Sequence, residues 1–179
     1  MSSTPVGPTT PNPRQIFLVA EQFYRIVGIV LKEMLPEDRA QIVMEGDTPY
    51  KIAPIIAMCA FSFELYLKCL IVLDGGAPPR LHDLEKLFAQ LNPRRKAEVE
   101  EKYDEERRTS PLSGGDDYSA NRVLARSKEA FESHRYIYEF ENPRSADSWM
   151  CQKLANVVRD IIIKQCPEWL PPPFQAVPG

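Results

Sequence analysis

Apolar residues recur at steps of three and four positions through most of this chain, which is the spacing of one face of an α-helix. The strand period of two does not stand out anywhere, and there is no internal repeat. The pattern therefore predicts an all-α fold, an up-and-down bundle of four or five long helices with short helices between them. The predicted helices cover residues 14–35, 48–73 or 54–73, 81–91, 93–108, 119–141 and 145–166, and 36–44 has room for one short helix.

Prolines and capping residues mark where these helices begin and end. Pro36 stops the first helix, and Asn92-Pro93 opens the helix at 93–108, because an Asn cap followed by a first-turn proline is a typical helix start. The start of the apolar helix is open between two positions. Thr48-Pro49 has the same cap-and-proline form, but Pro54 cannot lie deep inside an unkinked helix.

The two ends of the chain differ from the middle in composition. Residues 1–13 are rich in Pro, Ser and Thr and predict a flexible tail; without a basic stretch and an apolar core they are not a signal peptide. Residues 167–179 contain three consecutive prolines, which forbid a helix and favour an extended segment. We therefore expect one helical domain over residues 14–166 between two tails.

The most apolar stretch is residues 55–73, which holds only two charged residues, Glu64 and Lys68. Its nineteen residues approach the roughly 20 that a membrane span needs. Each charge at its middle would cost about 2.5–3.5 kcal/mol in a bilayer, so we interpret the stretch as a buried helix and expect no membrane association. Because the two residues lie four apart, they face each other one helical turn apart and are expected to pair.

Composition narrows the function classes. A net charge of −3 gives no overall positive field, so a nucleic-acid role would need a local basic patch. With two histidines and no HExxH motif, we expect neither a metal nor a cofactor. The cysteines are scattered without a CxxC pair, and we expect reduced thiols in a cytoplasmic protein: Cys59, Cys69, Cys151 and Cys166.

Arg135 borders a predicted apolar stripe. On a helix it shares one face with Phe131 and Tyr138, so its guanidinium needs a carboxylate. Glu139 lies one turn on, and Glu64 could approach from the apolar helix. Arginine can form two parallel bonds with either carboxylate.

Together with other polar residues, these positions form a group that is unusual for the interior of a helical bundle. His82 stands at the start of the helix 81–91, and Asp83 in its first turn, where a negative charge is favoured. The set has two interpretations, a buried ion-pair network that fixes helix register or a polar cleft that binds phosphate or a base, and spacing alone favours the first. Its members are Glu64, Lys68, His82, Asp83, His134, Arg135 and Glu139.

Segment 94–108 is almost wholly charged. The simplest interpretation is a solvated helix held by neighbouring opposite charges, each pair worth about 0.2–0.5 kcal/mol. Its basic clusters, Arg94-Arg95-Lys96 and Arg107-Arg108, could contact phosphates, although the intervening acids weaken that interpretation.

Three segments in this order resemble the HEPN superfamily: PheGluLeuTyrLeuLys (63–68), HisAspLeuGluLysLeuPhe (82–88) and, after Phe131, ArgTyrIleTyrGlu (135–139). The resemblance covers residues 53–166. In particular, the chain is similar to bacterial stand-alone members with a Glu-Leu-x-x-Lys helix. It implies an all-α bundle, commonly a homodimer with a cleft between protomers. Many members are metal-independent ribonucleases of toxin–antitoxin and phage-defence systems, and others bind or scaffold without catalysis.

The catalytic signature that the resemblance implies is an arginine followed, after four to six residues, by a histidine on a late helix. The histidine moves a proton of the ribose hydroxyl, and the arginine holds the phosphorane charge. The closest match is Arg126 and His134, with seven residues between them, which an ideal helix would rotate by about 80° and separate by about 12 Å. Arg135 is the other candidate arginine, and Tyr136 could stack on a base.

Three functions are therefore open. The first is a HEPN-like module that dimerises and binds a nucleotide, RNA or a protein partner such as an antitoxin. The second is a metal-independent endoribonuclease that uses His134 with Arg126 or Arg135. The third is a structural interaction domain whose Pro-rich tail docks on a partner. The residues expected to line the cleft are Glu64, Lys68, His82, Asp83, Tyr136 and Glu139.

Overall fold

The computed structural model describes residues 11–33, 48–109, 118–128, 130–131 and 148–170, and these contain helices and no strand. The fold is all-α, as the apolar spacing predicts. The long helices are α1 (Pro13–Glu33), α3 (Thr48–Leu73), α5 (Pro93–Arg108) and α8 (Ser148–Gln165). The short ones are α4 (Leu84–Ala89), α6 (Ala120–Ser127) and the 3₁₀ turn η3 (Pro167–Trp169).

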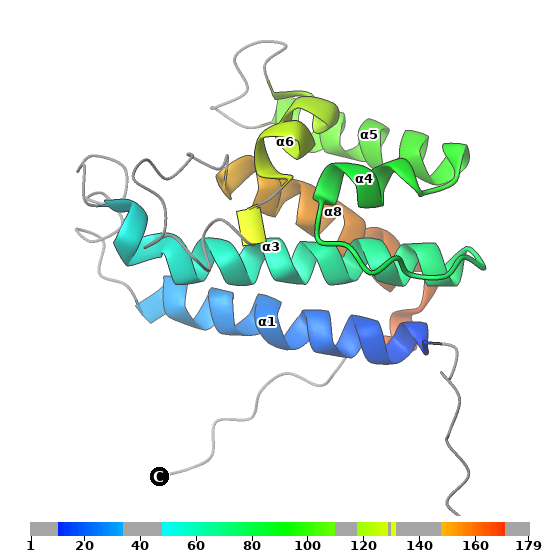
Figure 1. Ribbon diagram of the computed structural model, residues 1–179, viewed down its shortest axis with the longest axis horizontal. Coiled ribbons are helices and arrows are strands. Elements are labelled where there is room, and N and C mark those ends of the chain that lie inside the picture. Colours follow the sequence, from blue (N-terminus) through cyan, green and yellow to red (C-terminus); the bar gives the residue numbers. More distant parts are fainter. Residues whose placement is uncertain (1–10, 34–47, 110–117, 129, 132–147, 171–179) are drawn as a thin grey trace, which may run out of the picture.

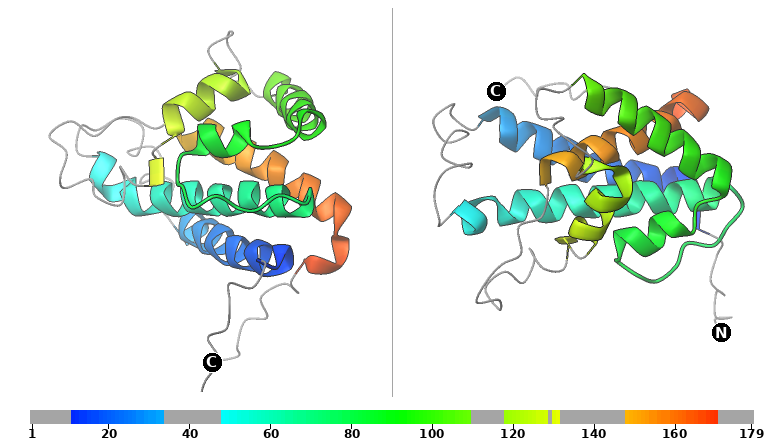
Figure 2. Two further views of the ribbon diagram at one scale, coloured as in Figure 1. Left: turned by 45° about the vertical axis from the view of Figure 1, so that its right-hand side comes forward. Right: turned by 90° about the horizontal axis from the view of Figure 1, so that it is seen from above.

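Helix α3 is the central element of the bundle. Helix α1 runs antiparallel along one side of it, and α8 packs on another side (Figure 1). Helix α5 packs on α8, while α4 and α6 pack on each other and cover α3 and α8 (Figure 2). The most apolar stretch of the sequence is thus surrounded by other helices.

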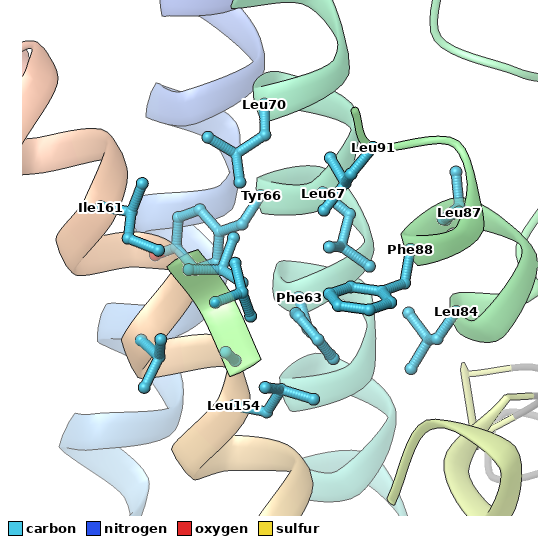
Figure 3. Close-up of a cluster of buried hydrophobic side chains, with 14 of the residues drawn as sticks. Phe63, Tyr66, Leu67, Leu70, Leu84, Leu87, Phe88, Leu91, Leu154 and Ile161 are labelled. Carbon is cyan, nitrogen blue, oxygen red and sulfur yellow. The ribbon is translucent and has the colours of Figure 1, made fainter. Parts of the chain in front are cut away.

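The core forms where α3, α4 and α8 meet, as Figure 3 shows. Its largest buried side chains come from all three helices and include Phe63, Tyr66, Leu67, Leu70, Leu84, Leu87, Leu154 and Ile161. By length and composition, Ala53–Leu73 is the one helix of the described residues that could cross a membrane, but 61% of it is buried inside the bundle. This arrangement is consistent with a soluble protein.

Helix α3 begins at Thr48, the earlier of the two predicted starts, and continues through Pro54. Of the two predicted starts, the later one at Pro54 is therefore wrong, and α3 includes this proline beyond its first turn. Pro54 is exposed, so its ring displaces no core side chain, although the helix loses one backbone hydrogen bond there.

Two helices are shorter than predicted because residues expected at their ends form hydrogen bonds outside the helix. Helix α4 begins at Leu84 rather than residue 81, since the Asp83 carboxylate caps it by accepting a hydrogen bond from the Lys86 N–H (3.0 Å). Helix α6 ends at Ser127, and the Lys128 carbonyl, in a turn, accepts a hydrogen bond from the Leu84 N–H (3.0 Å). The continuous helix predicted over 119–141 is therefore wrong at Lys128.

The outer helices also differ in detail from the pattern. Helix α1 buries Phe17, Ala20, Glu21 and Val27, but leaves Val30 and Leu31 of the predicted apolar face exposed. At the other end, Trp169 packs on Phe17 with ring centroids 6.0 Å apart, so the packed chain continues beyond the expected boundary at residue 166. The predicted cap Ser145 lies outside the described residues.

All four cysteines are free thiols, and three of them are buried. Burial raises the pKa of Cys59 and of Cys69 to about 12. Both thiols therefore stay protonated at neutral pH and pack as small apolar groups, as expected from their place in the apolar stretch.

Candidate functional site: a buried carboxylate and a half-exposed histidine

Glu64 lies in the middle of α3 with its side chain only 1% exposed. Lys68, one turn further along the helix, places its Nζ 2.7 Å from Glu64 Oε1. The pairing predicted from their spacing is present. A carboxylate buried this deeply needs such a partner, because an isolated charge in a low-dielectric interior is very costly.

His82 supplies a second partner from the loop before α4. Its Nδ1 lies 3.0 Å from Oε1 and 2.9 Å from Oε2 of Glu64, so the tautomer that carries a proton on Nδ1 donates to the carboxylate. The His82 side chain is 46% exposed, and its Nε2 forms no hydrogen bond with a described residue. We call Glu64, Lys68 and His82 the Glu64 cluster. It fixes one edge of the imidazole and presents the other to solvent.

Asp83 acts on the cluster through the backbone. Its carboxylate caps α4 and pairs with Lys86 (3.2 Å), so it is the N-cap rather than a first-turn residue as predicted. Burial raises the pKa of Asp83, but the hydrogen bonds from the Lys86 and Glu85 backbone and from the Lys86 side chain outweigh it, and the pKa is lowered. The cap holds the loop in which the neighbouring His82 sits.

The late part of the chain reaches the Glu64 cluster at Phe131. The Phe131 ring lies 5.7 Å from the His82 ring and stacks on Phe61 of α3 at 4.8 Å. Arg126 is exposed on α6, with its guanidinium 5.6 Å from the centre of the Tyr118 ring. The other predicted site residues follow Phe131 and lie outside the described residues: His134, Arg135, Tyr136 and Glu139.

A second buried carboxylate, Glu21 of α1, was missed by the sequence reasoning. Its side chain is 1% exposed and accepts a hydrogen bond from the Tyr66 hydroxyl of α3 (2.6 Å). Arg159 of α8 forks onto it, with Nε on Oε1 and Nη2 on Oε2 (3.0 Å). One signal was available, because Glu21 falls on the helix face of Phe17 and Ala20, which is otherwise apolar.

The Glu21 network ties three helices together. Burial raises the pKa of Tyr66, and the hydrogen bond to Glu21 raises it further, so the hydroxyl stays protonated and donates. Burial lowers the pKa of Arg159, but its bonds to Glu21 outweigh this and raise it, so the fork stays charged. Arg159 also lies over the Tyr24 ring at 4.8 Å. With its groups mutually satisfied, this network joins α1, α3 and α8 and leaves little to bind a ligand.

The described residues contain no group of three or more His, Cys, Asp or Glu side chains that could hold a metal ion. The Glu64 cluster itself offers hydrogen bonding and proton transfer by an imidazole that a carboxylate positions.

The sequence was compared with models of known protein families, and the result agrees with the all-α fold. A family model for the HEPN domain matches residues 39–165, more than half of the chain. The chain belongs to the HEPN family. The match covers the Glu64 cluster and every described helix from α3 to α8, while α1 precedes it. Searches of curated proteins and of solved structures returned no match.

Proposed function

We propose that this HEPN domain is a dimeric RNA-binding module whose binding face centres on the Glu64 cluster. The observation that carries the proposal is the half-exposed His82, whose Nδ1 is held by a buried carboxylate while Nε2 faces outward. An imidazole held in this way loses little conformational freedom when it binds a phosphate oxygen or a base edge. Lys68, 15% exposed beside it, adds positive charge.

Binding rather than catalysis is favoured because Lys68 and His82 already satisfy the buried charge. The Phe131 ring next to His82 adds an aromatic surface of the kind on which unpaired bases stack. Tyr136 and Arg135 belong to the segment that follows Phe131, and we propose that they extend this face.

Replacing His82 by alanine is expected to weaken RNA binding about 5- to 10-fold, the effect of losing about 1–1.4 kcal/mol of hydrogen bonding. Fluorescence anisotropy with a labelled single-stranded RNA of mixed sequence measures the Kd. Arg14→Ala is the matched control, since it removes a full cationic side chain from the exposed start of α1. Its Kd should stay within about twofold of the parent value at the same salt concentration.

Circular dichroism on both variants separates loss of binding from loss of fold. An unchanged Kd for the His82 variant would remove the Glu64 cluster from the binding face. Absence of RNA binding by the parent protein at micromolar concentration would remove the proposal, and competition by a mononucleotide alone would redirect it to a nucleotide ligand.

Self-association is supported by the outward face of α1. Val19, Ile26, Ile29 and Val30 are 42%, 45%, 51% and 36% exposed and follow one another at helical spacing. The only charges within residues 16–31 are turned inward, since Glu21 is buried and Arg25 lies 3.9 Å from it. The outer face of α1 is thus uncharged and, apart from the exposed Gln22, largely apolar. We propose that a second copy covers this face, which we call the α1 stripe.

Ile26→Glu is expected to make the protein monomeric, because it places a charge at the centre of the α1 stripe. Light scattering coupled to gel filtration gives the mass of parent and variant at matched concentration. Ala97→Glu, on the exposed side of α5, adds the same charge elsewhere and should leave the mass unchanged. A parent protein that is already monomeric would contradict the proposed dimer.

A second candidate function is a metal-independent endoribonuclease that uses His134 with Arg126 or Arg135. Two contacts favour it: the Lys128 carbonyl accepts a hydrogen bond from the Leu84 N–H, and the Phe131 ring lies next to the His82 ring. The segment that carries His134 follows Phe131 in the sequence. In this candidate function, His134 removes a proton from a ribose hydroxyl.

The nuclease candidate predicts cleavage of RNA in the presence of EDTA. His134→Ala should lower the rate by about 10²–10⁴-fold, the usual contribution of general acid–base catalysis, while leaving the thermal midpoint unchanged. Gel analysis of several structured and unstructured RNAs is the measurement. If none of these RNAs is cleaved in EDTA, the nuclease candidate is excluded and only the RNA-binding module remains.

We further propose a cytoplasmic toxin–antitoxin or phage-defence setting, in which an antitoxin-like protein would be a partner.

A further inference from the structure

A polar groove of about 470 Å³ lies at the end of the bundle where α3 and α8 finish and α5 begins (Figure 1, right). Only one of its lining residues is apolar. The lining consists of Asp74, Asn92, Arg94, Arg95, Glu98, Ile161, Lys164 and Gln165. Asp74 follows Glu64 by ten residues, which is about 15 Å along the axis of α3 and its end, so the groove is distinct from the Glu64 cluster.

Arg95 is the fixed element of the groove. Its guanidinium donates to Asp74 Oδ1 (3.0 Å), Glu98 Oε2 (2.8 Å) and the Gln165 side-chain oxygen (2.8 Å). The Asn92 amide also donates to Asp74 Oδ2 (2.8 Å). These bonds hold side chains from α5 and its cap, from α8 and from the turn after α3 in one arrangement, and they neutralise much of the charge of the two carboxylates.

Two further cations in the groove are not used in this way. Arg94 and Lys164 are both exposed, and neither forms an ion pair or hydrogen bond with another described residue. Lys96, the third cation of the Arg94-Arg95-Lys96 cluster, donates to the Ala89 carbonyl and stabilises the end of α4. With three cations against two carboxylates, the lining carries a net positive charge.

The start of α5 adds to this positive field. A helix N-terminus carries a partial positive charge that normally attracts acidic side chains. The first turn of α5 has no acidic residue and holds Arg94 and Arg95 instead. Asp74 offsets part of this positive charge through Asn92 and Arg95, and the part that remains favours an anion in the groove.

We propose that this groove binds a small phosphate monoester that also carries hydroxyl groups. The phosphate would lie between Arg94 and Lys164, the two groove cations that pair with no other side chain in the part of the chain that the structure describes. Oxygen acceptors for the hydroxyls are at hand in Glu98 and Gln165, which line the same space. The volume falls within the range of small-molecule sites, which is roughly 300–1,000 Å³. The inference goes beyond the proposed RNA-binding function and does not depend on it.

Isothermal titration with ribose 5-phosphate and AMP, each against its unphosphorylated counterpart, ribose and adenosine, tests the proposal. The phosphorylated probes are expected to bind and the unphosphorylated ones to bind at least tenfold more weakly. Replacing both cations, Arg94→Gln with Lys164→Gln, should lower the affinity for the phosphorylated probes at least tenfold. Arg14→Gln removes an exposed cation at the start of α1 and should change nothing.

The same variants separate this site from the proposed RNA site. Loss of monoester binding in the double variant with RNA binding intact supports the groove as an independent small-molecule site. Loss of RNA affinity in the double variant, with no binding of the monoesters, would assign the phosphate to an RNA backbone and overturn the small-molecule site. Equal affinity of parent and double variant, or no binding of either monoester at millimolar concentration, would also overturn it.

Discussion

Replacing Glu21 by alanine is expected to lower the free energy of unfolding by about 3–5 kcal/mol, the loss seen when one partner of a buried ion pair is removed. The substitution leaves the Arg159 fork and the Tyr66 hydroxyl without their acceptor. Because these groups come from α1, α3 and α8, the loss loosens three helices together. Urea titration followed by circular dichroism at 222 nm measures the effect.

Glu33→Ala provides the matched control on the same helix. Glu33 is exposed at the end of α1, so its removal should cost less than about 0.5 kcal/mol. Arg159→Lys is a second variant, and it should be clearly destabilising because a lysine cannot form the fork. A cost below about 1 kcal/mol for Glu21→Ala would mean that the network contributes little to holding the helices together.

Glu64→Ala is expected to cost about 2–4 kcal/mol. The loss is smaller than for Glu21 because Lys68 and His82, the two groups left behind, both reach solvent. The same titration gives the value, and the exposed Glu101 on α5 is the control, with an expected cost below about 0.5 kcal/mol on mutation to alanine.

A double variant separates the cost of an orphaned charge from the value of the pair. Glu64→Leu combined with Lys68→Met replaces both charges by apolar groups of similar size, and should recover part of the stability lost in Glu64→Leu alone. If the double variant is no more stable than the single one, the lysine is already solvated and the pair itself is worth little.

The apolar periodicity was enough to predict the class of the fold. It placed α1 and α8 close to their observed bounds. The almost wholly charged α5 was located by Asn92-Pro93 instead, which marked its start correctly because capping is a local interaction. The Glu64–Lys68 pair was predictable for the same reason, since both residues lie on one helix four positions apart.

The errors fall where a distant segment changes a local preference. Lys128 interrupts the predicted helix at 119–141, and its carbonyl bonds with the Leu84 N–H across the bundle. Glu21 is buried although it is charged, because Arg159 lies 138 positions further along the chain and meets it there.

The sequence by itself determined the helical class, the family resemblance, the Asn92 cap of α5 and the pairing within α3. These depend on residues within about one helical turn of each other or on the order of motifs. Only the tertiary structure decided that His82 joins Glu64, that Glu21 binds Arg159 and that Arg94 and Lys164 share one groove. Each of those meetings joins separate elements, and it depends on how the helices pack rather than on any spacing along the chain.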